Sequence, residues 1–196
     1  MDDITSTSGD QSIDQDLEVF YEKKYRKYQK KIAHLQKTLM RGGQLDEMFC
    51  PNNDLITVKF DSMSEPIVNE QIVPLEKVQS KPTISFKHLG DNLYTILMLD
   101  PDVPSVSNPI KRHWLHWMKI NHSLANDGNE VINFEPSNPP QGSGVHRYYF
   151  KIYKQRNPIN QNVLPGIERS GFDVDSFITV HHLQLIACIH YKTEQL

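Results

Sequence analysis

The stretch from Leu93 to Asn121 constrains the fold more than any other part of the chain. Residues 93–99 (LYTILML) are almost wholly apolar, and seven residues is a typical length for a strand and too short for most helices. A strand without polar alternation has both faces covered, so this run predicts a central strand of a sheet. A second run, His113–Asn121, follows a proline-rich loop and is the predicted neighbour of the first.

Alternation of apolar and polar residues predicts further strands. Ile56, Val58 and Phe60 begin the series, and the other runs are Thr83–Phe86, Val131–Phe134, Val145–Lys154 and Leu183–Tyr191. Residues 66–75 predict a weaker strand or an extended arm, and residues 173–180 a short helix. Turns connect these strands, and long helices do not alternate with them. The pattern therefore predicts an all-β antiparallel sandwich of two sheets.

The first 43 residues differ from this pattern. Residues 1–13 are polar, and we expect a disordered acidic tail. Residues 14–43 predict an amphipathic helix with a basic polar face. Its apolar stripe is formed by Tyr21, Tyr25, Tyr28, Ile32, Leu35 and Leu39. Two interpretations of the basic face stay open: a solvated appendage, or a docking surface for an acidic partner, an anionic membrane or a second helix. Residues 44–196 form the predicted domain.

Composition excludes several classes of protein. The net charge of -3 argues against a general nucleic-acid binder. The two cysteines, Cys50 and Cys188, do not make a disulfide framework and indicate a reducing compartment, although one bridge stays open. No apolar run approaches the roughly 20 residues that span a bilayer. The N-terminus has no apolar core of the kind a secretory signal carries. We therefore expect a cytoplasmic protein.

Polar side chains interrupt three of the apolar segments. They are Asp100 and Asp102 after the central strand, Trp114 and His116 on its neighbour, and His146 and Tyr148 on a later strand. Residues two apart on a strand share a face, so each of the last two pairs points to one side. By the same parity Leu115 and Trp117 point the other way, as do Arg147 and Tyr149. If the segments converge, they line one small polar pocket, in which imidazole and loop N–H groups hold a phosphate and the carboxylate an ammonium group.

The same segments also resemble the motifs of a known protein family. DPDVPS, RHWLHW and NPPQGSGVHRYYFKIY occur in an order and spacing that resemble the phosphatidylethanolamine-binding protein (PEBP) family, over about residues 50–191. That family includes the Raf kinase inhibitor protein and plant flowering-time regulators. The resemblance implies a two-sheet antiparallel Greek-key sandwich with a small anion-binding cavity at one end, here with an added N-terminal helix.

The resemblance also implies roles for individual residues. The ligand-binding set is Asp100 and His116 at the floor, Tyr148 as donor, Trp114 and Pro139 as walls and His146 at the mouth. The pocket-shaping set is Asp102, Pro104, Asn138, Pro140, Gly142 and Gly144. The chain departs from the family pattern at Val103, Leu115 and Asn138, where Ala, His and Gly are usual. The short C-terminal end predicts a wider mouth, which the N-terminal helix could cover.

The implied function is binding and regulation, with no catalytic residue, cofactor or metal. The expected ligand is a phosphate-bearing small molecule or phospholipid headgroup of the phosphatidylethanolamine type, and the expected protein partner a kinase or protease. The alternative is a structural or assembly protein with a vestigial pocket, which interacts through the basic helix. No G-x-S-x-G motif or P-loop supports a hydrolase. On a regular strand His113 and His116 point to opposite faces, which disfavours a zinc site that uses both of them.

Overall fold

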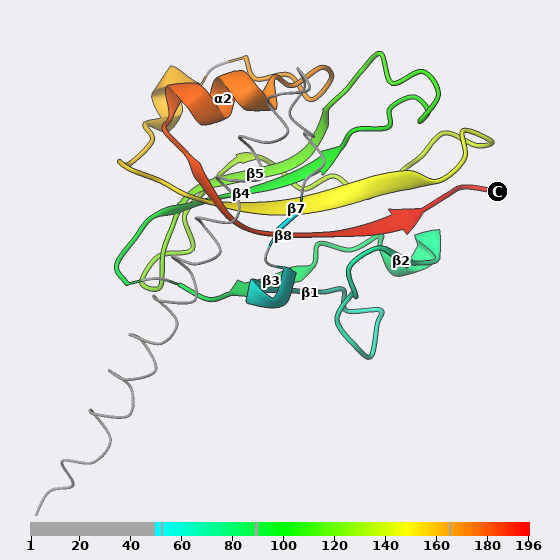
Figure 1. Ribbon diagram of the computed structural model, residues 1–196, viewed down its shortest axis with the longest axis horizontal. Coiled ribbons are helices and arrows are strands. Elements are labelled where there is room, and N and C mark those ends of the chain that lie inside the picture. The colour runs from blue at the N-terminus through cyan, green and yellow to red at the C-terminus, as the bar shows by residue number, and fades with distance from the viewer. Residues whose placement is uncertain (1–49, 52, 89, 165) are drawn as a thin grey trace, which may run out of the picture. The chain divides into compact units, whose positions relative to one another are not determined.

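A six-stranded sheet forms the centre of the part of the chain that the structure describes, residues 50–196 without 52, 89 and 165. The structure is a computed structural model (Figure 1). The strands in spatial order are β2 (Gln71–Ile72), β8 (Gln184–Thr193), β7 (His146–Lys154), β4 (Tyr94–Asp100), β5 (Trp114–His122) and β6 (Asn129–Ile132). The predicted acidic tail and N-terminal helix lie outside the described residues.

A second, two-stranded sheet pairs β1 (Ile56–Lys59) with β3 (Thr83–Phe86). In the described part of the chain, the helical elements are the α-helix α2 (Val174–Val180) and the 3-10 turns η2 (Asn53–Leu55), η3 (Leu75–Lys77) and η4 (Gln161–Val163). Asp173 caps α2 by accepting a hydrogen bond from the N–H of Ser176. The predominantly β character of the domain is thus confirmed, and its Greek-key topology stays a prediction.

The central position of β4 is confirmed. All seven of its residues are buried, and it pairs antiparallel with β5 on one side and β7 on the other. The prediction of purely antiparallel pairing is wrong at one edge, because β2 runs parallel to β8. Only two residues of the predicted arm at 66–75 pair in this way, since prolines on either side remove the donors that a longer ladder needs.

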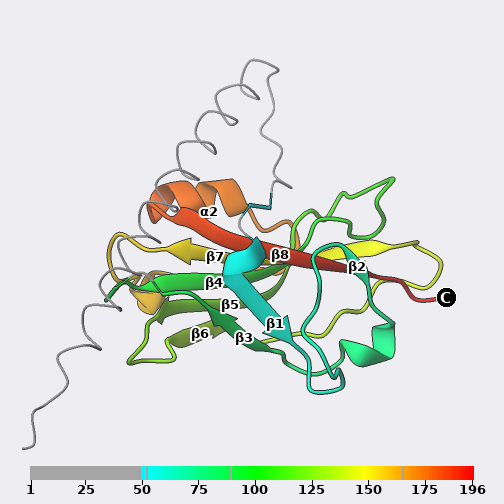
Figure 2. The same ribbon diagram turned by 60° about the horizontal axis from the view of Figure 1, so that its bottom comes forward.

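Each face of the six-stranded sheet has its own cover. Figures 1 and 2 show α2 over one face and the β1–β3 pair over the other. Under α2, Phe172 and Phe177 pack against a cluster that includes Leu97 and Leu99 of β4. This arrangement explains why β4 has no polar alternation until its last residue, Asp100.

A β-bulge in β5 changes which of its residues share a face. Met98 pairs with Trp117, whereas Leu99 pairs with Leu115, so β5 carries one extra residue at this point. Leu115 joins the hydrophobic cluster under α2, while the Trp117 ring packs edge-on against Phe134. The prediction that Leu115 and Trp117 point the same way is wrong, because strict alternation applies only to a strand without a bulge.

The one bridge that the two cysteines allow is formed. Cys50 and Cys188 are joined by a disulfide, with 5.0 Å between their Cα atoms, across a sequence separation of 138 residues. Disulfides are typical of oxidising compartments, so this bridge weighs against the predicted cytoplasmic location, which stays a prediction. Among the described residues, no helix has the length and apolar character needed to cross a membrane.

Candidate functional site

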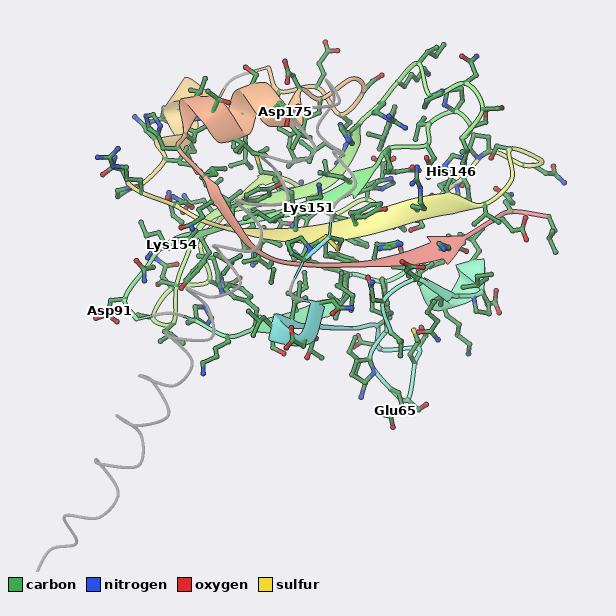
Figure 3. The ribbon with its side chains drawn as sticks, in the orientation of Figure 1. Glu65, Asp91, His146, Lys151, Lys154 and Asp175 are labelled. Atoms are coloured by element: carbon green, nitrogen blue, oxygen red, sulfur yellow. A yellow bond between two sulfur atoms is a disulfide. The ribbon has the colours of Figure 1, made fainter. Side chains whose placement is uncertain are left out.

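The three polar segments of the sequence meet at one end of the six-stranded sheet. Asp100 ends β4 and His146 begins the antiparallel neighbour β7, so their side chains face each other. His146 Nδ1 lies 2.8 Å from Asp100 Oδ2, and the two side chains are 0% and 1% exposed. Figure 3 shows His146 at the start of β7, at the same end of the sheet as the C-terminus. His146 therefore lies in the interior and not at an exposed mouth.

Asp100 is held on both of its carboxylate oxygens. Its Oδ1 accepts a hydrogen bond of 2.7 Å from the N–H of Asp102, while Oδ2 faces His146. On the other side of the imidazole, His146 Nε2 lies 3.0 Å from the hydroxyl oxygen of Ser143. Burial lowers the pKa of His146, but the hydrogen bond and negative charge of Asp100 outweigh it, and the net shift is upward. The charged imidazole is thus stabilised at this position.

The raised pKa of His146 predicts how stability depends on pH. A folded-state pKa above the ordinary value of 6.5 stabilises the fold fully below that value, and this contribution is lost as pH rises through the folded pKa. We expect the free energy of unfolding of the wild type to fall, relative to that of His146→Gln, as the pH rises above 6.5. Urea unfolding of both proteins across this range measures the difference. Parallel pH profiles would contradict the prediction.

Two neutral polar rings complete what we call the polar cluster: Asp100, His116, His146 and Tyr148. The rings of His116 and Tyr148 lie 5.2 Å apart between centroids. Burial, and then the negative charge of Asp100, raise the pKa of Tyr148, which keeps the phenol protonated. Burial lowers the pKa of His116. Its Nδ1 donates to the carbonyl oxygen of Glu135 at 3.0 Å, which leaves Nε2 as an acceptor in the neutral ring.

Three residues near the polar cluster were not predicted from the sequence. Tyr191 on β8 pairs in register with Tyr148, and their rings stack 5.3 Å apart. The Tyr191 hydroxyl forms a short hydrogen bond with Ser137. Glu135 accepts a hydrogen bond of 3.2 Å from the indole of Trp114. A register for the last two strands would have identified Tyr191, because cross-strand partners share a face.

Asp102 anchors the loop after β4. Its buried carboxylate accepts three hydrogen bonds from Arg147: from the backbone N–H at 3.0 Å, from Nε at 2.7 Å and from Nη2 at 2.6 Å. Arg147 thus supports the fold, as strand parity indicated. The carbonyl of Pro104 on the same loop also raises the pKa of His146. Asp102 therefore fixes the loop to the start of β7, next to the polar cluster.

The remaining predicted residues surround the polar cluster to different degrees. Pro139 is buried and Trp114 is half-buried, as walls of a pocket would be. The exposed members of the pocket-shaping set are Asn138, Pro140, Gly142 and Gly144. The two glycines have φ angles of 72° and 85°, which side chains with a Cβ rarely adopt. A turn with this backbone therefore needs glycine at both positions.

Fold and polar cluster together define a β-sheet protein with buried titratable groups at one end of its sheet, an arrangement typical of small-ligand binding proteins. Residues 63–191 match the sequence profile described as "Phosphatidylethanolamine-binding protein". The chain belongs to this family, and the resemblance inferred from the three motifs is thereby confirmed.

Individual relatives support this assignment. The chain is similar to the protein FLOWERING LOCUS T of Arabidopsis thaliana, with 32% identity over 74% of this chain and 83% of the relative. It is 36% identical to a "26 kDa secreted antigen" of Toxocara canis over 55% of this chain, but that match spans only 44% of the antigen. The solved carboxypeptidase Y inhibitor, in complex with its cognate proteinase, has a TM-score of 0.61 at 24% identity over 72% of this chain and 83% of the inhibitor. At this identity the likeness shows the fold alone.

Proposed function

We propose that this protein is a binding and regulatory protein whose polar cluster holds a phosphate-bearing headgroup of the phosphatidylethanolamine type. The observation that carries the proposal is the buried Asp100–His146 pair, which is 2.8 Å long and lies at the positions of the family motifs. Burying two charges is costly and often adds nothing to stability, so such a pair in a binding-protein fold suggests a role in recognition.

The chemistry of the polar cluster suits both ends of such a ligand. The charged imidazole of His146 attracts a phosphate, and the phenol of Tyr148 is a neutral donor beside it. Asp100 attracts an ammonium group. The same donors suit a phosphoserine or phosphothreonine on a protein partner such as a kinase or protease, which we include in the proposal. The comparisons do not favour the alternative of a structural or assembly protein.

The proposal is tested by NMR titration of the full chain with phosphoethanolamine. We expect saturable amide shifts at Asp100, His116 and residues 141–148, and their loss in His116→Ala. The matched control is His122→Ala, which removes the same side chain from the same strand about 20 Å away, at roughly 3.3 Å per residue. This control should bind like the wild type.

Parallel titrations with inorganic phosphate and a phosphoserine peptide separate the sources of the phosphate group. Tighter binding of phosphoethanolamine than of phosphate would assign the carboxylate its role toward the ammonium group. The proposal would be wrong if millimolar phosphoethanolamine left all these amides unshifted, or if His116→Ala and wild type gave the same shifts.

A further inference from the structure

Ser143, His146 and Asp100 form a continuous hydrogen-bonded chain. Ser143 Oγ lies 3.0 Å from His146 Nε2, and His146 Nδ1 lies 2.8 Å from Asp100 Oδ2. A hydroxyl, an imidazole and a carboxylate in this order make up an activated nucleophile: a base within reach of the hydroxyl, and a third group that orients the base. This arrangement is recognised by geometry and not by sequence motif, so the missing G-x-S-x-G does not exclude it.

We infer that Ser143 is a nucleophile that takes an acyl group from activated carboxylic esters, with His146 as its base and Asp100 as the positioning residue. This inference does not depend on phosphate binding by the polar cluster. It also challenges the expectation that the protein has no catalytic residue.

The carboxylate fixes the tautomer that the reaction requires. Asp100 accepts hydrogen bonds from the N–H of Asp102 and from His146 Nδ1, so Nδ1 carries a proton in both the charged and the neutral imidazole. In the neutral form the lone pair is therefore on Nε2, which faces Ser143. Because Asp100 and His146 are buried, this orientation is held by the core of the domain.

The nucleophile is accessible where its partners are not. Ser143 is partly exposed and lies between Gly142 and Gly144. A Cβ atom built at either glycine would have no heavy atom within 4 Å apart from those of its chain neighbours, so open space lies beside both glycines that flank the serine. An ester carbonyl can therefore approach Ser143 Oγ from solvent while His146 stays shielded behind it.

The protonation of His146 decides whether the hydroxyl is activated. Ser143 Oγ also lies 2.5 Å from the carbonyl oxygen of Pro140. When His146 is charged, Nε2–H donates to Ser143 Oγ, and the hydroxyl can donate only to Pro140. When His146 loses that proton, the hydroxyl donates to Nε2 and can be deprotonated during attack. Since Asp100 raises the pKa of His146, we expect the reactive form on the alkaline side of the ordinary value.

The chemical step uses only the ester and water. Ser143 Oγ attacks the carbonyl carbon as its proton passes to His146 Nε2, and the tetrahedral intermediate expels the alcohol, which takes that proton. Water, deprotonated by His146, then attacks the acyl-serine and releases the carboxylic acid, which restores Ser143. We assign no oxyanion donors, and each such donor contributes about 10²–10³ in rate in known enzymes. We therefore expect slow turnover and accumulation of the acyl-serine.

The test is reaction of the full chain with p-nitrophenyl acetate between pH 6 and 9.5. Peptide mass spectrometry should find acetyl on Ser143. The acylation rate should rise with pH and level off above the pKa of His146, and it should be about 10²-fold faster than in His146→Gln. Ser143→Ala, which changes a partly exposed side chain, should keep the fold and lose the modification.

Ser107→Ala is the matched control, because Ser107 is an exposed loop serine whose described hydroxyl partner is Ser105. This variant should react like the wild type. Three results would each overturn the inference: acetylation of Ser143 no faster than that of Ser107, an unchanged rate in Ser143→Ala, or a rate at Ser143 that does not depend on pH. If His146→Gln does not fold, Ser143→Ala still decides the test.

Discussion

Breaking the Cys50–Cys188 disulfide is expected to lower the free energy of unfolding by about 5 kcal/mol. The bridge closes a loop of 138 residues, and a crosslink across so long a segment removes many conformations from the unfolded chain. Folded domains are stable by only about 5–15 kcal/mol, so the bridge would account for a large part of the total. Guanidinium unfolding with and without a reductant measures the difference.

Cys50→Ser provides the control for this experiment. It replaces the half-buried partner of the bridge and leaves Cys188, which is fully buried, in place. The variant should unfold like the reduced wild type, and the reductant should not change it further. A difference below about 1 kcal/mol between oxidised and reduced wild type would contradict the prediction. A large difference would make a reducing compartment unsuitable for the protein, and so would also argue against the predicted cytoplasmic location.

The sequence left the formation of this bridge open, because the two cysteines are neighbours only in the folded chain. Cys188 lies in β8, and the segment that holds Cys50 contacts that strand, where the N–H of Cys188 donates to the carbonyl of Pro51. No spacing rule covers two cysteines so far apart in sequence. Local periodicity, by contrast, predicted β4 and its neighbours correctly, because burial on both faces leaves a direct trace in the sequence.

The polar cluster could be predicted from the local pattern of the strands, whereas the residues around it could not. Asp100, His116 and Tyr148 are polar positions in largely buried strands, and antiparallel pairing brings such positions together. Ser143 lies in a turn whose shape depends on positive φ angles at the glycines on either side, so the sequence alone does not show that its hydroxyl faces His146. Alternation in the sequence did not predict the bulge in β5, because the place where a strand takes up an extra residue depends on its pairing with the neighbouring strand.

Replacing Asp102 with alanine is expected to destabilise the protein by about 3–5 kcal/mol. The variant removes the acceptor of three hydrogen bonds and leaves the guanidinium of Arg147, which is only 27% exposed, without its counter-charge. Urea unfolding at neutral pH measures the loss. Glu70→Gln is the comparison, because it weakens an exposed pair, 3.7 Å from Lys192, and should cost less than about 1 kcal/mol.

The double variant Asp102→Ala/Arg147→Met separates the two parts of this loss. If the unpaired charge causes most of it, removing the guanidinium as well should restore part of the stability of the single variant. If the cost comes from the freed loop after β4, the double variant should be no more stable than Asp102→Ala. In that case the N–H of Asp102 would also no longer hold Asp100 in place, and phosphoethanolamine binding should weaken even in molecules that remain folded. A loss below about 1 kcal/mol in Asp102→Ala would contradict the prediction and show that the ion pair does not stabilise the loop.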